Sequence, residues 1–360
     1  MNYHLVLTRS CNLNCIYCHG GEETGPDTEV TYSLDDLEEF LQKDDDPQLM
    51  FYGGEPCLRI PLMMRIMDRF QHARFMLQTN ALLLDRIPID YAKRFHSILV
   101  SIDGTRNVTD FYRSEGVYER VLRNVRWLRS IGFRGDIVAR MAVSEQSGIH
   151  REVNHLLNLT DPRFDHVHWQ LNVVWDAEGN WTDFDAWVDS SYRPGVSQLV
   201  REWVSAMSTG VVRGIVPFMP IAHSLLTGEQ SGLRCGSGID TFAIHVDGSI
   251  GVCPISPDWG FSIVGDIRRT DPRDLHNIMH VEEPCPSCKD FWICGGRCLF
   301  ANKQRLWGDE GFEKVCETVR HLIHEIRNEM PRIRQYVEEG LVKVQDFDYP
   351  EYNNGCEIIP

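Results

Sequence analysis

The stretch TRSCNLNCIYCHG, residues 8–20, places Cys11, Cys15 and Cys18 directly after a short apolar segment. Three cysteines this close together converge when the chain wraps around one thiophilic object, and thiolates favour zinc or an iron-sulfur cluster. An all-cysteine structural zinc site is closed by four ligands, whereas a cubane held by three cysteines keeps one iron open. The count of three therefore favours a cluster with an open iron, although this spacing arises by chance in roughly one such chain in a hundred.

Length, charge and cysteine content narrow the classes of protein. A chain of 360 residues suggests two domains or a barrel with an appendage, at about 150 residues per domain. The net charge of -16 disfavours nucleic acid as a partner, because phosphate binding needs clustered cations. No secretory signal or membrane span is recognisable, which predicts a cytoplasmic protein without a membrane partner. Twelve cysteines in a reducing compartment indicate metal ligands rather than disulfides. Because oxygen destroys free iron-sulfur clusters, an anaerobic host is expected.

The hydrophobic pattern alternates between short strands and amphipathic helices. The expected strands are 3–8, 48–52, 74–78, 97–102, 136–143 and 166–173. The expected helices are 34–43, 62–72, 89–95, 118–131, 148–159 and 196–207, the first with Ser33 as its cap and Asp36 at its third position. Six strand-helix units are too few for a full eight-stranded barrel, so the pattern predicts an α/β fold with a partial, TIM-like barrel of six strands.

Polar or glycine-rich motifs follow four of these strands. Cys11 and its partners follow the first strand, Gly53-Gly54-Glu55-Pro56 the second and Asn80 the third, while Ser101-Ile102-Asp103-Gly104 closes the fourth. In such barrels the working groups sit at the carboxyl ends of the strands. Each glycine motif is also an ordinary turn when met alone. Their joint placement on one face is what predicts a site.

Four segments lie outside the six units. Residues 175–193 read as a loop over the barrel mouth, whose Trp181, Phe184 and Trp187 either contact a substrate or pack the loop down. Residues 211–230 read as a linker. A helix is expected over 319–329 and should end or kink at Pro331. The tail 346–360 either covers the barrel mouth or is unstructured, and the second is expected.

A second cysteine system occupies the carboxyl half. Cys235 and Cys253 flank a predicted hairpin with a tight Asp247-Gly248 turn. Further along the chain come five more cysteines, of which the first four have a spacing expected by chance about once in two thousand such chains. These five are Cys285, Cys288, Cys294, Cys298 and Cys316. A zinc ribbon remains the competing interpretation, because CxxC pairs are elements of zinc sites.

Taken together, these motifs resemble the radical S-adenosylmethionine (SAM) superfamily. The resemblance rests on CxxxCxxC with Tyr17 before its last cysteine, on GGEP after the second strand, and on SIDG followed by Arg113. The carboxyl half resembles the SPASM domain, which carries two auxiliary 4Fe-4S clusters. The run CGGRCLFANKQRLWGDEGFEKVCETVRHLI is similar to a set of peptide-modifying enzymes of anaerobes.

The resemblance implies the cofactors and their ligands. It implies three 4Fe-4S clusters and SAM, with the SAM-binding cluster on the three cysteines of the opening stretch. It also implies SAM contacts from Gly53, Gly54 and Glu55 at the methionine amino end, from Ser101 and Asp103 at the ribose, and from Arg113 at the carboxylate. Tyr17, Pro56 and Asn80 complete the predicted cofactor-binding residues.

The two auxiliary clusters are implied in the same way. Cys285, Cys288, Cys294 and Cys316 would hold one, and Cys235, Cys253 and Cys298 would supply three ligands of the other. We predict that the fourth iron of the latter is open and available to a substrate thiolate; the alternatives are Cys356 from the tail or a non-cysteine ligand. Cys57 is expected to be buried packing, and Cys356 a free thiol. The implied domains are a barrel over 1–220, a SPASM domain over 221–330 and an extension over 331–360.

The implied activity is hydrogen abstraction from a residue of a peptide or protein by a 5'-deoxyadenosyl radical, with ferredoxin or flavodoxin as reductant. The alternatives are the same chemistry on a small molecule, formylglycine formation, and a non-catalytic zinc or iron-sulfur scaffold. Formylglycine formation is disfavoured because Pro254 stands where sulfatase-maturing relatives carry a catalytic Asp. The chain also begins at the first strand, so a leader-binding domain ahead of the barrel is not expected.

Overall fold

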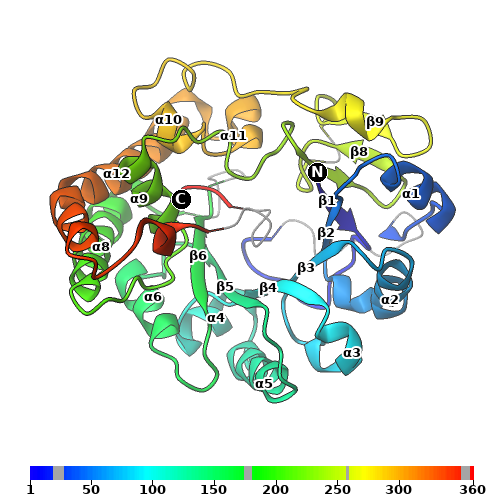
Figure 1. Ribbon diagram of the computed structural model, residues 1–360, viewed down its shortest axis with the longest axis horizontal. Helices are drawn as coiled ribbons and strands as arrows, with labels where there is room; N and C mark the ends of the chain where they lie inside the picture. The colour runs from blue at the N-terminus through cyan, green and yellow to red at the C-terminus, as the bar shows by residue number, and fades with distance from the viewer. Residues whose placement is uncertain (19–27, 174–180, 257–258, 350–356) are drawn as a thin grey trace.

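The computed structural model describes residues 1–18, 28–173, 181–256, 259–349 and 357–360. Nine strands in these ranges form one curved sheet, and the helices lie around its outer side (Figure 1). The order across the sheet is β6-β5-β4-β3-β2-β1-β7-β8-β9. The strands are β1 Asn2–Val6, β2 Gln48–Tyr52, β3 Arg74–Thr79, β4 Phe95–Ser101, β5 Asp136–Val143, β6 His166–Leu171, β7 Thr241–Ile244, β8 Ser249–Gly251 and β9 Ile263–Asp266.

The first six strands run parallel in sequence order, which confirms the predicted partial barrel. Their apolar runs are nearly continuous because parallel strands are covered on both faces. One face packs against the outer helices. The other carries a small apolar layer made of Met50, Met76, Leu99 and Val138, one residue from each of β2 to β5. The interior of the barrel is therefore filled by side chains at the level of these four residues.

The helices cover the sheet as the 3.6-residue periodicity predicts. Helix α1 has the expected Ser33 cap, and the Asp36 side chain accepts a hydrogen bond from the Ser33 backbone in return. The longer helices are α1 Leu34–Leu41, α2 Ile60–Arg69, α4 Arg106–Arg113, α5 Val117–Ser130, α6 Ile149–Leu157, α8 Arg193–Met207, α9 Phe218–Thr227 and α12 Gly308–Glu338. The short ones are α3 Ile89–Ala92, α7 Phe184–Trp187, α10 Phe291–Cys294 and α11 Leu299–Gln304.

Helix α12 passes through Pro331, which corrects the expectation that the helix ends there. The helix runs from Gly308 to Glu338 with Pro331 inside it. Proline removes one backbone donor and strains the preceding turn, at a cost of about 3 kcal/mol. Buried Met330 and Ile333 lie on either side of the proline, so burial of the helix face offsets this cost. Within the predicted linking segment, 211–230, residues Phe218–Thr227 form α9.

The aromatic residues after β6 pack the segment down, as one of the two interpretations predicted. Trp181 donates to the Asn172 carbonyl at 2.6 Å, and Trp187 donates to the Ser147 carbonyl at 3.2 Å. Phe184 and Trp187 are buried, and Phe184 also contacts Trp307 edge to face. Residues 175–180 of the predicted loop lie outside the described residues. This segment continues into α7 and a π-helix, Val188–Tyr192.

The cysteine-rich half is joined to the barrel through the sheet. Strand β7 pairs in parallel with β1, in a register that matches Asn2 with Thr241. Strands β7 and β8 then form the predicted antiparallel hairpin, with Gly248 at a φ of 89° in its turn. A positive φ is where glycine is favoured, so the Asp247-Gly248 turn is correctly predicted.

The carboxyl-terminal tail is more ordered than predicted. Phe347 and Tyr349 are buried, and so are Ile358 and Ile359. The His168 ring on β6 lies 3.1 Å from the Ile358 carbonyl, within the ring of elements in Figure 1. Burial of these apolar side chains overcomes the entropy that normally keeps a tail mobile.

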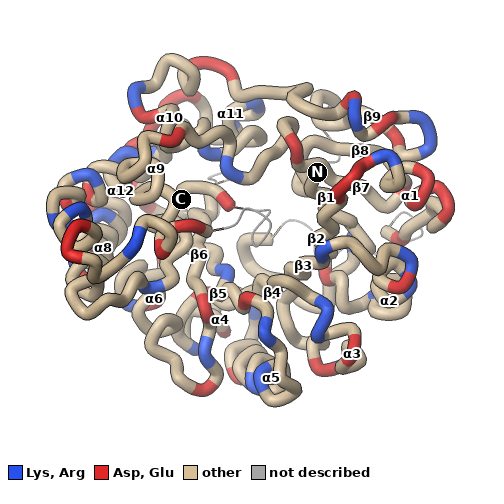
Figure 2. Tube along the Cα trace, viewed as in Figure 1, with Lys and Arg blue, Asp and Glu red and all other residues tan. Residues whose placement is uncertain are grey.

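Charged residues are spread over the surface. Figure 2 shows Lys and Arg interspersed with Asp and Glu along the outer helices. No described helix combines the length and the apolar character that a membrane span requires.

Candidate active site

The three cysteines of the opening stretch lie together in the loop after β1. Cys15 is buried, Cys11 is half-buried and Cys18 is exposed, and the Cys18 amide donates to the Cys15 carbonyl at 2.9 Å. Burial raises the pKa of the Cys15 thiol to about 11, and the Arg113 charge opposes that rise. Negative charge on Cys18 or Cys11 would raise the Cys15 pKa further. The three thiols therefore lie close enough to interact electrostatically.

The GGEP motif packs directly against this loop. The Gly54 amide donates to the Thr8 carbonyl and the Glu55 amide to the Ser10 carbonyl, both at 2.9 Å. A Cβ added to Gly53 would lie 2.3 Å from the Thr8 oxygen, and one added to Gly54 would lie 2.2 Å from the Ser10 oxygen. The paired glycines therefore let the ends of β1 and β2 approach each other, in addition to any contact with a ligand.

Glu55 holds the end of β3 in place. Its carboxylate is 1% exposed and accepts hydrogen bonds from the Thr79 hydroxyl at 2.7 Å, the Asn80 amide at 2.8 Å and the Cys57 amide at 2.9 Å. Burial raises the pKa of Glu55, and the three donors work against that rise. Pro56 begins the 3-10 helix Pro56–Arg59 and is buried. The Glu55 oxygen that faces Asn80 keeps one acceptor position for a further donor.

Asn80 links β3 to the cysteine loop. Its side-chain amide donates to the Asn12 side chain at 2.7 Å and lies 3.8 Å from the Cys11 sulfur. Asn80 itself is buried. The prediction that the ends of the first three strands meet at one place therefore agrees with the observed contacts.

Asp103 forms the most enclosed charge of this region. The carboxylate is 0% exposed and accepts four hydrogen bonds, two from Arg113 at 2.7 and 2.9 Å, one from the Tyr17 hydroxyl at 2.7 Å and one from the Ala142 amide at 2.9 Å. The Arg113 guanidinium also lies 5.5 Å from the centre of the Tyr17 ring. A carboxylate has about four acceptor positions, so those of Asp103 are filled.

This network changes the interpretation of two predicted SAM contacts. A ribose bond to Asp103 or a carboxylate bond to Arg113 would have to replace a bond within the protein. Both contacts stay predictions. What the structure provides is a buried ion pair that ties Tyr17 of the cysteine loop to β5 and α4. Ser101, the last residue of β4, is half-buried beside this network.

Four cysteines of the second system also lie together. Burial raises the pKa of the Cys285 thiol to about 12, and thiolate charge on Cys316, Cys294 and Cys288 would raise it further. The Asn302 side-chain amide lies 3.5 Å from the Cys285 sulfur. These four are the predicted ligands of one auxiliary cluster, brought from a turn, the end of α10 and the amino-terminal third of α12.

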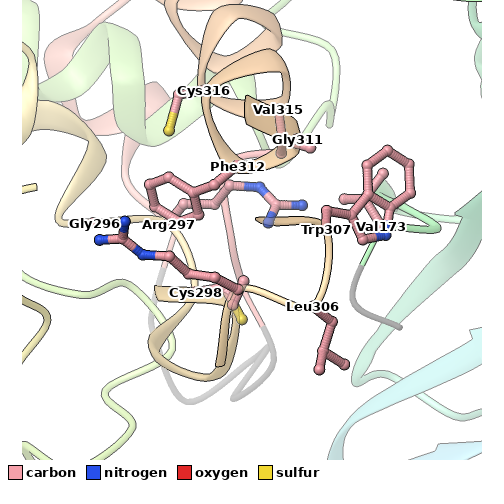
Figure 3. A pocket seen from close by; sticks show the side chains of 12 residues that line it. Val173, Gly296, Arg297, Cys298, Leu306, Trp307, Gly311, Phe312, Val315 and Cys316 are labelled. Carbon is pink, nitrogen blue, oxygen red and sulfur yellow. The ribbon is translucent and has the colours of Figure 1, made fainter. Parts of the chain in front are cut away.

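The remaining three predicted ligands come from other elements. Cys235 follows α9 and lies 3.3 Å from the Ser237 hydroxyl, Cys253 follows β8, and Cys298 precedes α11. Cys298 and Cys316 line one cavity together with Arg297 (Figure 3). Cys356, one of the options for a fourth ligand, lies outside the described residues. Over the described ranges, no three His, Cys, Asp or Glu side chains form a group that could hold a single metal ion.

Cys57 behaves as the sequence predicted. It is 3% exposed, its sulfur lies 3.5 Å from the Thr79 hydroxyl, and burial raises the pKa of its thiol well above the usual value.

Sequence reasoning missed Arg297, which is 6% exposed between Gly296 and Cys298. The signal available in the sequence is the motif GGRC, which places an arginine directly before a predicted cluster ligand.

Comparison with known proteins agrees with this geometry. Residues 5–145 match the family model of the Radical SAM superfamily, so the chain contains a radical SAM domain. Such a domain implies a 4Fe-4S cluster and S-adenosylmethionine (AdoMet) as cofactors.

Among curated proteins, the AdoMet-dependent heme synthase of Methanosarcina barkeri is 32% identical over 143 residues, which cover 35% of this chain and 38% of that protein. An uncharacterized protein of Methanocaldococcus jannaschii is 31% identical over 110 residues, which cover 28% of this chain and 38% of that protein. The matched region thus spans about two fifths of each of these relatives.

Among solved structures, anSMEcpe with bound AdoMet superposes with a TM-score of 0.72 at 17% identity, covering 94% of this chain and 96% of that one. SuiB of Streptococcus suis bound to its precursor peptide SuiA gives a TM-score of 0.59 at 14% identity, covering 83% and 72%. At these identities the likeness shows the fold: a partial barrel with a cysteine-rich carboxyl half.

The close approach of the first two loops predicts the effect of Gly54→Ala. The new methyl group would meet the Ser10 carbonyl, so the loops must separate, and overpacking of this kind costs about 1–3 kcal/mol. We expect a lower urea midpoint in the apoprotein and less iron after reconstitution. Gly260→Ala is the matched control, because nothing lies within 4 Å of its added Cβ. Equal midpoints for the two variants would contradict the close-packing argument.

The Asp103 network predicts the effect of Asp103→Asn. Removing one partner of a buried ion pair leaves the other charge uncompensated and typically costs about 3–5 kcal/mol of the free energy of unfolding. Asp85→Asn breaks the partly exposed pair with Arg120 and should cost at most about 1 kcal/mol. Urea unfolding of both apoproteins measures the difference. A similar loss in both would show that Asp103 does not hold the loop.

Proposed function

We propose that this chain is a radical SAM enzyme that abstracts hydrogen from a residue of a peptide or protein. The observation that carries the proposal is the set of three loops packed on one another at the carboxyl ends of β1, β2 and β3. One loop brings three thiols, the next brings paired glycines, and Glu55 joins both to the third. A non-catalytic cysteine scaffold would need the thiols and their packing, but it has no use for the acceptor position that Glu55 keeps.

The residues present fit a three-cysteine cluster. Cys11, Cys15 and Cys18 would hold it, with the positive charge of Arg113 favouring the thiolate of Cys15. The Asn80 amide beside the Cys11 sulfur would orient that ligand. When bound, the cluster supplies the electron that splits AdoMet into methionine and a 5'-deoxyadenosyl radical.

The protein's own part is to position the reactants and exclude water. The Tyr17 hydroxyl donates to Asp103, which restrains the conformation of the loop that carries the three cysteines. The remaining acceptor position on Glu55 suits an amino group of AdoMet. Ser101 at the end of β4 stays the proposed contact to the ribose. Residues 220 and 330, the expected domain boundaries, lie inside α9 and α12, so we propose the barrel, the SPASM domain and the extension as an order along the chain without divisions at those residues. We also propose a cytoplasmic location, with ferredoxin or flavodoxin as the electron donor.

The substrate class rests on the comparisons. Structures of anSMEcpe with a bound Cp18Cys peptide and of SuiB with its precursor peptide share this fold over 93% and 83% of the chain. Two auxiliary clusters, on the cysteines named above, would take up an electron or bind substrate. A small molecule as substrate is the alternative.

Cluster content tests the enzyme proposal. After anaerobic reconstitution we expect about twelve irons and as many sulfides per chain, as for three cubanes. The variant with Cys11, Cys15 and Cys18 changed to Ala should lose about four irons and all production of 5'-deoxyadenosine from AdoMet and dithionite. Cys57→Ala is the control, because this nearby thiol is not a proposed ligand. One or two zinc ions without sulfide would overturn the proposal, as would cleavage that survives the triple change.

Isotope transfer tests the substrate class. Short peptides encoded beside the gene would be synthesised with deuterium on the α carbons and all side-chain carbons and incubated with the reduced enzyme and AdoMet. Deuterium in the recovered 5'-deoxyadenosine, seen by mass spectrometry, is the expected result, because abstraction moves the isotope from substrate to radical. Transfer from a deuterated metabolite extract, with none from any peptide, would favour the small-molecule alternative.

A further inference from the structure

Arg297 is a buried cation in the loop between α10 and α11. It is 6% exposed, and it follows Gly295 and Gly296 in the run of positive φ values 65°, 93° and 58°. The last of these belongs to Arg297 itself, in a conformation that residues other than glycine adopt at a cost. Its amide donates to the Cys294 carbonyl at 3.4 Å. The loop thus turns sharply and directs a charged side chain into the interior.

The Arg297 guanidinium is not neutralised by the part of the protein that the structure describes. Its Nε and Nη2 atoms are buried and have no hydrogen-bond partner in the described ranges. A buried charge without a partner is costly by several kcal/mol, so buried arginines are normally paired. Arg113, for example, is bonded twice to Asp103. Arg297 therefore calls for an anion.

Arg305 lines the same cavity and shows the contrast. It donates to the Asp309 carboxylate and to the Glu283 carbonyl, and it lies 5.0 Å from the centre of the Phe312 ring. It therefore has its own partners in the protein. Of the two arginines that line the cavity, Arg305 is thus paired within the protein, so the need for an anion applies to Arg297 alone.

Two thiols, those of Cys298 and Cys316, line the same cavity as Arg297. Burial raises the pKa of Cys316 to about 11, and the Arg297 charge opposes this rise more than any other group does. The same charge opposes the rise at Cys294. Figure 3 shows the Arg297 side chain extending from beside Cys298 on the side of the cavity where the Cys316 sulfur lies. Cys316 lines the same cavity as Arg297, and the Cys294 carbonyl accepts a hydrogen bond from the Arg297 amide. Both cysteines belong to one proposed ligand set, so we place the missing anion at that set.

We propose that Arg297 binds the auxiliary cluster at Cys285, Cys288, Cys294 and Cys316, donating hydrogen bonds from Nε and Nη2 to its sulfur atoms. The inference rests on the proposed function, which places a cluster there. Four thiolates around a cubane with a 2+ core leave a net charge of about -2, which is the anion that the guanidinium lacks.

The consequence is a higher reduction potential for this cluster. Reduction adds a negative charge, so a fixed cation and hydrogen bonds to sulfur stabilise the reduced form more than the oxidised one. Arg297 is then a positioning and tuning residue, which makes the cluster a better electron acceptor than it would be without this charge.

A redox titration tests the proposal. The Cys11→Ala, Cys15→Ala, Cys18→Ala protein removes the AdoMet cluster, so electron paramagnetic resonance follows the two auxiliary clusters alone. In this background we would compare Arg297, Arg297→Met, Arg297→Lys and the control Arg305→Met. For Arg297→Met we expect the equilibrium constant for one-electron reduction of one of the two clusters to fall at least tenfold. This corresponds to a shift of about 59 mV to more negative potential for one electron.

The other variants complete the test. Arg297→Lys keeps the charge and should shift the same couple less, while Arg305→Met should leave both unchanged. If Arg297→Met instead loses about four irons that Arg297→Lys retains, the charge is needed to hold the cluster, which also supports the proposal. Unchanged potentials in fully loaded Arg297→Met, or equal iron loss in both Arg297 variants, would overturn it. Absence of auxiliary signals in the unsubstituted background would instead overturn the cluster assignment in the proposed function.

Discussion

Strand β1 is hydrogen-bonded on both edges, to β2 on one side and to β7 on the other. The two neighbours are separated by almost two hundred residues of chain, yet they share the register of one strand. Because backbone bonds in a sheet fix both spacing and direction, the barrel and the cysteine-rich half form one continuous surface. The loop after β1, with its three thiols, therefore lies where the two halves of the molecule meet.

Electrostatics then shapes each group of thiols differently. Next to Cys15, the cation is Arg113, which Asp103 already neutralises, so the pair is a fixed dipole that also holds Tyr17. Next to Cys316, the cation is Arg297, which the described part of the protein leaves uncompensated. A neutral pair orients a loop, whereas an uncompensated charge favours an anionic ligand. The two sites therefore use buried arginine for different purposes.

Close packing is the second requirement for the site. The paired glycines of GGEP were expected to admit a ligand, and the structure shows that they also admit the backbone of the cysteine loop. Likewise, Asp103 was expected at a ribose, and its four bonds lie within the protein. In both cases residues of the motif contact the loop that carries Cys11, Cys15 and Cys18 and hold it in place. A residue pattern identifies a motif without saying which of its atoms remain available to a ligand.

The sequence by itself determined the local elements and the order of the motifs. The six parallel strands, the Ser33 cap, the hairpin turn at Gly248 and the burial of Cys57 follow from patterns among neighbouring residues. Only the tertiary structure decided the rest: the pairing of β1 with β7, the Asp103–Arg113 pair, the course of α12 through Pro331, and the buried tail at Ile358. Each of these depends on packing between elements, whose free energy local periodicity does not contain.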